Sequence, residues 1–198
     1  MKEYAFGIDL GGTTAKIGLF KTTGELLEKW EVPTDTSNAG EHILKNLAAA
    51  VQGKMQEKGL AAEQVEGVGV GVPGPVLDSR IVPIICANLG GWGKHNVAEE
   101  LGDMLGGIKV LVGNDANVAA LGEIWMGAAK GCRSAVMVTL APAWAVVSSS
   151  TARSLMAPTV PAARSATSPW TATRPLPAAA ASTDVWSSIP APPALCAA

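Results

Sequence analysis

The sequence has few cysteines and no long apolar segment. Only three of its 198 residues are cysteine, and the odd number and wide spacing of Cys86, Cys132 and Cys196 exclude a disulfide framework or a zinc cluster. No run of about 18 apolar residues occurs, and Lys2 and Glu3 stand before a short strand-like stretch instead of a signal-peptide core. The formal net charge of -2 excludes a dedicated polyanion binder. We therefore expect a soluble, cytoplasmic protein with no nucleic acid partner and no membrane partner.

Glycine is absent from residues 141–198, although the chain has 22 glycines, all of them in residues 1–140. Average usage of about 7% predicts about four glycines in a segment of that length. Of these 58 residues, 41 are Ala, Ser, Thr or Pro, nine of them proline, and Lys and Glu do not occur. Such a composition offers too little periodic apolar surface to offset chain entropy. We expect residues 141–198 to form a disordered tail.

Residues 1–140 predict strands and helices in alternation. Apolar residues recur at strand or helix spacing, and glycine or proline separates the segments. The expected strands are 4–10, 14–20, 25–32, 65–72, 108–112 and 134–140, and the expected helices are 41–58, 96–105 and 115–130. The first three strands form an antiparallel meander, and a crossover helix follows them. This order is typical of an α/β fold.

The segment from Asp9 to Lys16 is the first candidate site, in the turn between the first two expected strands. Glycines let backbone N–H groups approach phosphate oxygens, threonine hydroxyls donate to them, Lys16 adds a positive charge, and Asp9 can hold Mg²⁺ through water. A plain hairpin turn is the alternative. The order of residue types after an apolar strand favours phosphate binding, although no Gly-Lys-Ser/Thr leads into a helix as in a Walker loop. The candidate phosphate-binding residues are Asp9, Gly11, Gly12, Thr13, Thr14 and Lys16.

Asn114 and Asp115 form the second candidate site, where an expected strand passes into an expected helix. Ligands tend to bind at the carboxyl ends of strands in α/β sheets, and a carboxylate there can accept a proton from a substrate hydroxyl. Helix capping is the alternative, because Asn and Asp are common at helix N-termini. On its own the motif favours a cap, but the phosphate-binding segment shifts the interpretation towards catalysis.

Two glycine-bearing segments are weaker candidates. Asn88 lies in the segment Asn-Leu-Gly-Gly-Trp, where its amide can bind a sugar hydroxyl, or the segment is a plain loop anchored by Trp92. Gly74 lies between two prolines, in a turn that either contacts substrate through its backbone or is simply rigid. Both alternatives stay open for each segment.

Four segments together resemble the sugar kinases of the ROK (repressor, ORF, kinase) family, particularly bacterial glucokinases. They are 9–16, 70–76, 88–92 and 113–123. The resemblance implies an actin-like ATPase (ribonuclease H-like) fold of two α/β domains around a cleft, with ATP bound between them and the 6-hydroxyl of glucose as phosphoryl acceptor. Residues 1–114 would form the complete N-terminal domain, and residues 115–140 would begin the second domain.

The resemblance also implies residue roles, carried onto matching positions. Asp115 would be the catalytic base and would contact the sugar together with Gly74, Asn88 and Asn114. The phosphate loop would take ATP with Mg²⁺, in a reaction of glycolytic carbohydrate metabolism. Intact family members often form homo-oligomers and hold a structural zinc on a cysteine cluster. That cluster is missing here, so we expect no zinc.

Residues after Leu140 depart from the family, which would continue with a second glycine-rich phosphate loop, a sugar-binding stretch and the zinc cysteines. Codons read one base earlier offer an explanation. In that frame residues 141–147 are compatible with GTGVGGG, 156–170 with HGAHGAGGEIGHITV, and 178–188 with CGCGKHGCLEQ. These are the three missing family segments in the right order, and shifted glycine codons become alanine codons. We infer that a single-base loss near the Leu140 codon truncated a glucokinase and left this chain inactive.

Three other functions remain as alternatives. A non-catalytic ROK fragment describes the literal polypeptide. A sugar-responsive ROK repressor would carry a DNA-binding helix-turn-helix before the phosphate loop, and eight residues before Asp9 leave no room for one. A kinase for another hexose, such as N-acetylmannosamine, would share the same motifs.

Overall fold

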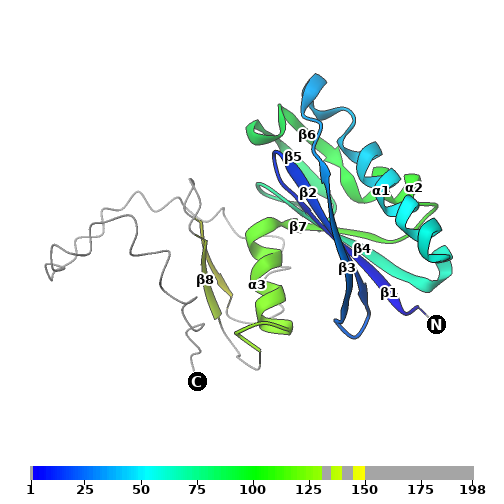
Figure 1. Ribbon diagram of the computed structural model, residues 1–198. Helices are drawn as coiled ribbons and strands as arrows, with labels where there is room; N and C mark the ends of the chain where they lie inside the picture. Colours follow the sequence, from blue (N-terminus) through cyan, green and yellow to red (C-terminus); the bar gives the residue numbers. More distant parts are fainter. Residues whose placement is uncertain (1, 131–134, 140–144, 150–198) are drawn as a thin grey trace, which may run out of the picture.

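The protein is described by a computed structural model, which places residues 2–130, 135–139 and 145–149 (Figure 1). Its centre is a mixed five-stranded sheet with the strand order β3-β2-β1-β4-β7. The strands are β1 (Tyr4–Leu10), β2 (Thr14–Lys21), β3 (Leu26–Pro33), β4 (Val65–Val72) and β7 (Val110–Asn114). β1, β2 and β3 are antiparallel neighbours, whereas β4 and β7 run parallel to β1. The α/β fold predicted from the sequence is confirmed.

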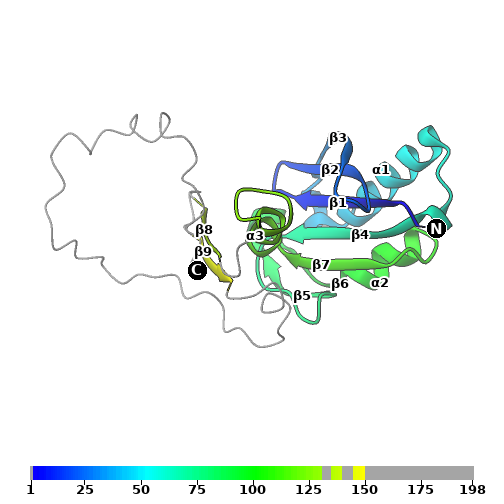
Figure 2. The ribbon, with the colours of Figure 1, turned by 90° about the horizontal axis from the view of Figure 1, so that it is seen from below.

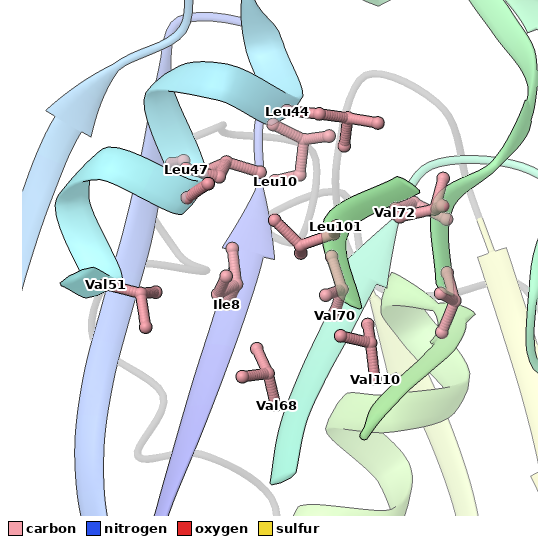
Figure 3. Close-up of a cluster of buried hydrophobic side chains, with 14 of the residues drawn as sticks. Ile8, Leu10, Leu44, Leu47, Val51, Val68, Val70, Val72, Leu101 and Val110 are labelled. Atoms are coloured by element: carbon pink, nitrogen blue, oxygen red, sulfur yellow. The ribbon is translucent and has the colours of Figure 1, made fainter. Parts of the chain in front are cut away.

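The main core fills one face of this sheet, beneath α1 (Ile43–Lys58) and α2 (Val97–Met104) (Figure 1). Successive strand residues point to opposite faces, so the alternation of valine and glycine from Val68 to Val72 directs every valine to the same side. Figure 3 shows these valines meeting apolar side chains of β1, α1, α2 and β7. The labelled residues are Ile8, Leu10, Leu44, Leu47, Val51, Val68, Val70, Val72, Leu101 and Val110.

The opposite face of the sheet carries α3 (Asp115–Trp125), which follows β7 directly (Figure 2). Glycines at the ends of β4 and β7 let the helix approach. A Cβ atom on Gly113 would lie 2.6 Å from Cγ2 of Val118, and one on Gly71 would lie 3.6 Å from Cα of Asp115. The face of the sheet that carries these glycines, here called the glycine side, therefore determines how closely the start of α3 can approach the strand ends.

A hairpin of β5 (Ile81–Cys86) and β6 (Trp92–Asn96) is a feature that the sequence did not predict. Pro83 lies inside β5, and the pairing is irregular between Val82 and Ile85. A proline within an apolar run normally argues against a strand, but an isolated two-stranded hairpin tolerates it. The turn of the hairpin is a short 3₁₀ helix, Ala87–Leu89.

Several element boundaries differ from the expected ones. α1 begins at Ile43, two residues late, because residues 37–40 form a separate 3₁₀ turn, and it ends as expected before Gly59, which adopts the left-handed conformation. α3 ends at Trp125 instead of Lys130. No helix among the described residues is long and apolar enough to cross a membrane.

A second hairpin lies beside α3, formed by β8 (Ala135–Thr139) and β9 (Ala145–Ser149) (Figure 2). β9 belongs to the segment 141–198, for which the composition predicts no packed structure. The run Ala-Val-Val supplies the β-branched residues that favour a strand at this point. The rest of the expected disordered tail lies outside the described residues.

An ion cluster joins β3 to α1 on the surface. Glu28 pairs with Lys54 at 2.6 Å and with Lys58 at 2.7 Å, and Nζ of Lys54 lies 5.0 Å from the ring centroid of Trp30. The hydrogen bond from Lys54, followed by that from Lys58, lowers the pKa of Glu28 below its ordinary value. The ionised carboxylate of Glu28 is therefore favoured by folding.

Replacing Leu101 by alanine should destabilise the fold by about 2–5 kcal/mol, because the side chain is fully buried in the core and leaves a cavity. The matched change at Leu26, which is 50% exposed, should shift the free energy of unfolding by less than about 0.5 kcal/mol. Urea unfolding followed by circular dichroism measures both. Equal effects at the two positions would show that the core is not packed as described.

Replacing Glu28 by glutamine should make the free energy of unfolding less sensitive to acid. The pKa of Glu28 is lower in the folded chain than in the unfolded chain, so its contribution is present above the unfolded pKa and is lost as pH falls through the folded pKa. Urea midpoints compared at about pH 7 and about pH 3 should converge for wild type and E28Q at the acidic end. A difference between the two proteins that is as large at about pH 3 as at about pH 7 would contradict a contribution from the ionised Glu28 carboxylate.

Candidate active site

Three parallel strands end at the same edge of the sheet and bring the candidate residues together. β1 ends just after Asp9, β4 ends at Val72 before Gly74, and β7 ends at Asn114. Parallel strands present their carboxyl ends at one edge, which is where α/β proteins commonly bind ligands. The candidate segments from three separate parts of the sequence therefore share one end of the domain.

The first candidate loop is a tight turn between β1 and β2. The N–H of Gly11 donates to the carbonyl of Thr14 at 3.1 Å, so the turn closes on itself. Thr34, which the sequence analysis did not single out, directly follows β3 and holds the turn: its hydroxyl donates to the carbonyl of Gly11 at 2.8 Å and its N–H to that of Thr13 at 2.9 Å. Gly12 and Thr13 are left exposed at the tip.

The flanks of this loop carry its charged and hydroxyl side chains. Asp9 and Lys16 are directly opposite in the antiparallel register, and both are exposed. They lie on the glycine side of the sheet, which α3 also occupies. Thr14 begins β2 and is partly buried.

Asn88 lies against the tip of the same loop. It is exposed in the 3₁₀ turn of the β5–β6 hairpin, and a Cβ atom on Gly12 would lie 2.6 Å from its carbonyl oxygen. Only glycine permits that approach. Two segments that are 76 positions apart in the sequence therefore form one surface.

Asn114 and Asp115 lie at the junction of β7 and α3, and Asn114 does cap the helix. Its Oδ1 accepts the N–H of Asn117 at 3.1 Å, so the capping alternative is correct as far as that oxygen goes. Its Nδ2 donates in two further directions, to the carbonyl of Gly74 at 3.1 Å and to Oδ1 of Asp115 at 2.9 Å. Capping and site formation thus use different atoms of one side chain.

The carboxylate of Asp115 is exposed but held on one side. Oδ1 accepts from Asn114 and from the N–H of Ala116 at 2.8 Å, so both of these bonds end on the same oxygen. Gly71 lies between Asp115 and the phosphate-loop candidate Asp9: it pairs with Asp9 in the sheet, and Asp115 packs over it. The two carboxylates therefore flank one glycine.

The turn containing Gly74 is held from two sides. Gly74 has a φ of 89°, a conformation that favours glycine, and its carbonyl accepts from Asn114. The thiol of Cys86 donates to the carbonyl of Pro73 at 3.3 Å. Burial, and secondarily the charge of Asp115, raises the pKa of the Cys86 thiol. The sequence analysis assigned Cys86 no role in the site, and its position two residues before Asn88 was the one available signal.

No group of three or more His, Cys, Asp or Glu side chains is positioned to hold a metal ion among the residues that the structure describes. Cys86 is a free, buried thiol, while Cys132 and Cys196 lie outside those residues.

Replacing Gly12 by alanine should destabilise the protein by about 1–3 kcal/mol, because the new methyl group meets the backbone of Asn88 and the loop must shift. Gly53 is the matched control: it lies within α1 with nothing near its missing side chain, so G53A should stabilise by about 0.5–1 kcal/mol. Thermal unfolding of both variants shows whether each substitution raises or lowers the stability of the protein. Stabilisation by both substitutions would contradict the contact between the two loops.

Comparison with known proteins gives a consistent assignment. Residues 5–142 match the ROK family. A glucokinase from Halalkalibacterium halodurans is 35% identical over 135 residues, which cover 68% of this chain and 40% of that protein. A ROK family glucokinase from Streptomyces griseus, solved in complex with glucose and AMPPNP, matches with a TM-score of 0.62 and 30% identity over 73% of this chain and 44% of that one.

A ROK hexokinase from Thermus thermophilus matches with a TM-score of 0.62 and 34% identity, covering 73% of this chain and 46% of that chain. The chain thus spans less than half the length of each of these relatives. The region of similarity contains the five-stranded sheet and the edge at which β1, β4 and β7 end. The match over most of its length shows that the chain belongs to the ROK family, in the region that it shares with glucokinases.

Proposed function

We propose that this protein derives from a glucokinase that transfers the γ-phosphoryl group of ATP to the 6-hydroxyl of glucose, with Asp115 as general base. The observation that carries the proposal is the junction of β7 and α3, where Asp115, Asn114 and the Gly74 turn are joined by hydrogen bonds next to the phosphate-loop edge. The presence of glucose and AMPPNP in the similar S. griseus enzyme supports it.

The sugar would bind at the β4–β7 end of this edge. Asn114 and Asn88 supply amide groups that can donate to and accept from hydroxyls, and Gly74 can offer its backbone N–H. Asn88 is exposed beside the phosphate loop, so a bound sugar would lie between that loop and Asp115. This arrangement would place an acceptor hydroxyl between the base and the phosphates.

Asp115 would take the proton from the 6-hydroxyl as the oxygen attacks phosphorus. Its Oδ1 already accepts two hydrogen bonds, which fixes the plane of the carboxylate, and Oδ2 carries neither of them. A carboxylate held in this way is oriented, and Oδ2 is left to meet a substrate hydroxyl. Phosphoryl transfer depends mainly on positioning and charge stabilisation, which is what such a base contributes.

The β1–β2 turn would hold the phosphates of ATP. Gly12 and Thr13 are exposed at its tip, where backbone N–H groups and the Thr13 hydroxyl can donate to phosphate oxygens, while Thr14 and Lys16 follow on β2. Mg²⁺ commonly binds through one or two carboxylates, water and substrate phosphates, and the exposed Asp9 suits that role. When bound, the ion would neutralise charge that builds up on the phosphates.

The 198-residue chain itself should phosphorylate glucose negligibly. Its family match ends at residue 142, and residues 141–198 contain no glycine with which to form a second phosphate loop. Phosphoryl transfer needs the nucleotide and the sugar in line, and half of the site cannot impose that geometry. A non-catalytic, sugar-binding ROK fragment is therefore the second candidate function for this polypeptide.

Restoring one base near the Leu140 codon should lengthen the product and produce ATP-dependent glucose phosphorylation, measured by coupled glucose 6-phosphate formation. In the restored enzyme Asp115→Asn should lower kcat by about 10² or more, because the base is lost. Asp103→Asn, at an exposed position in α2, is the matched control and should leave kcat unchanged.

Two outcomes would separate the parts of this proposal. Robust glucose phosphorylation by the purified, unrepaired chain would contradict the truncation. Unchanged turnover of the restored D115N enzyme would contradict the catalytic role of Asp115 but leave the truncation standing.

A further inference from the structure

Cys86 is buried at the edge that carries the candidate site, and its thiol has one defined partner. The residue ends β5 and is only 7% exposed. Its Sγ donates to the carbonyl oxygen of Pro73 at 3.3 Å. Its side chain also borders the open side of Gly74, where an added Cβ would lie 3.8 Å from the sulfur.

The neighbouring carbonyl of the same turn is held from the opposite element. Nδ2 of Asn114 donates to the carbonyl of Gly74 and to Oδ1 of Asp115. The carbonyls of two successive residues, Pro73 and Gly74, are thus bound by side chains from β5 and β7. This arrangement links Cys86 to the proposed base through the turn and Asn114.

The turn depends on these carbonyl contacts because it has few donors of its own. Pro73 and Pro75 have no backbone N–H, so Gly74 supplies the one amide proton of the three. Gly74 also has the conformational freedom that lets a turn change shape. Donors from outside the turn, Cys86 and Asn114, therefore hold it in one conformation.

The protonation state of Cys86 suits a donor. Burial raises the pKa of the thiol, and the nearby charge of Asp115 raises it further. The thiol consequently keeps its proton at neutral pH. A thiolate at this position would face a carbonyl oxygen and a carboxylate without a proton to share.

We infer that Cys86 is a positioning residue of the sugar site: its S–H bond to Pro73 fixes the turn that presents Gly74 to the sugar and supports Asn114 beside Asp115. This inference rests on the proposed function in naming a sugar as the ligand. The hold of Cys86 on the turn does not depend on that function. A residue of this kind acts by donating a hydrogen bond, so serine should substitute for it in part and alanine should not.

The order parameter of the Gly74 amide, measured by NMR relaxation in the 198-residue chain, tests the hold on the turn. In wild type it should lie near the value of a rigid backbone, about 0.85, and in C86A it should fall towards that of a flexible one, below about 0.6, because the hydrogen bond to the Pro73 carbonyl is lost. In C86S it should stay near the wild-type value. The amide of Leu47 in α1 reports any general loosening of the fold, and its order parameter should be unchanged in both variants. Equal Gly74 order parameters in C86A and C86S would overturn the inference.

The infrared S–H stretching band shows whether the Cys86 thiol is hydrogen-bonded. This test needs no change at Cys86, so it applies even if C86A does not fold. In a C132S/C196S background the band belongs to Cys86 alone. It should lie at the lower frequency of a hydrogen-bonded thiol and move to the free-thiol frequency on unfolding in urea. A free-thiol band in the folded chain would overturn the inference.

Glucose titration of the same three proteins, followed by Gly74 and Asn114 amide shifts, separates the inference from the function on which it rests. Weakening of glucose binding by about fivefold or more in C86A, with recovery in C86S, supports both. No glucose binding by the wild-type chain would contradict its sugar-binding role, while the order-parameter and infrared results would still decide whether Cys86 holds the turn. Equal glucose affinity in all three proteins would contradict the positioning role.

Discussion

The candidate site depends on one constraint, the common direction of β1, β4 and β7. Because these strands are parallel, the residues that follow them must meet at one edge of the sheet, although they are about 60 and then 40 positions apart in the sequence. Crossovers through α1 and α2 on the core face make the parallel arrangement possible. The phosphate loop, the Gly74 turn and Asp115 are neighbours for this reason and not through local sequence.

The alternation of valine and glycine in β4 connects the core to the site. Valine side chains on one face pack against α1 and α2, while the glycines on the other face leave space for the start of α3. A larger residue at Gly113 would meet Val118 and displace the helix that begins with Asp115. Core packing and the placement of Asp115 are therefore set by the two faces of the same strands.

Regular periodicity predicted most of the sheet and its helices, including the α1 end at Gly59 and the turn after β4. The β5–β6 hairpin could not be predicted, because Pro83 interrupts its apolar run and its pairing is irregular. Thr34 and Cys86 were missed for a different reason: each acts on a carbonyl far away in the sequence, and only the folded sheet brings the partners together. The roles given to Asp9, Asn88 and Asp115 stay predictions, since proximity at one edge defines a possible site without showing what it binds.

The proposed sugar side and the proposed phosphate side of the site are not equally complete in the part of the chain that the structure describes. Gly74, Asn88, Asn114 and Asp115 are all held by hydrogen bonds or close contacts within the N-terminal sheet and its hairpin, so the proposed sugar side is shaped before any second domain contributes. Among the described residues, the proposed phosphate side consists of the β1–β2 turn, whose tip is exposed. Alignment of a nucleotide with a sugar would require a second surface opposite that tip. The proposed sugar side is therefore the more complete of the two, and preorganisation of an acceptor does not by itself bring a donor into line.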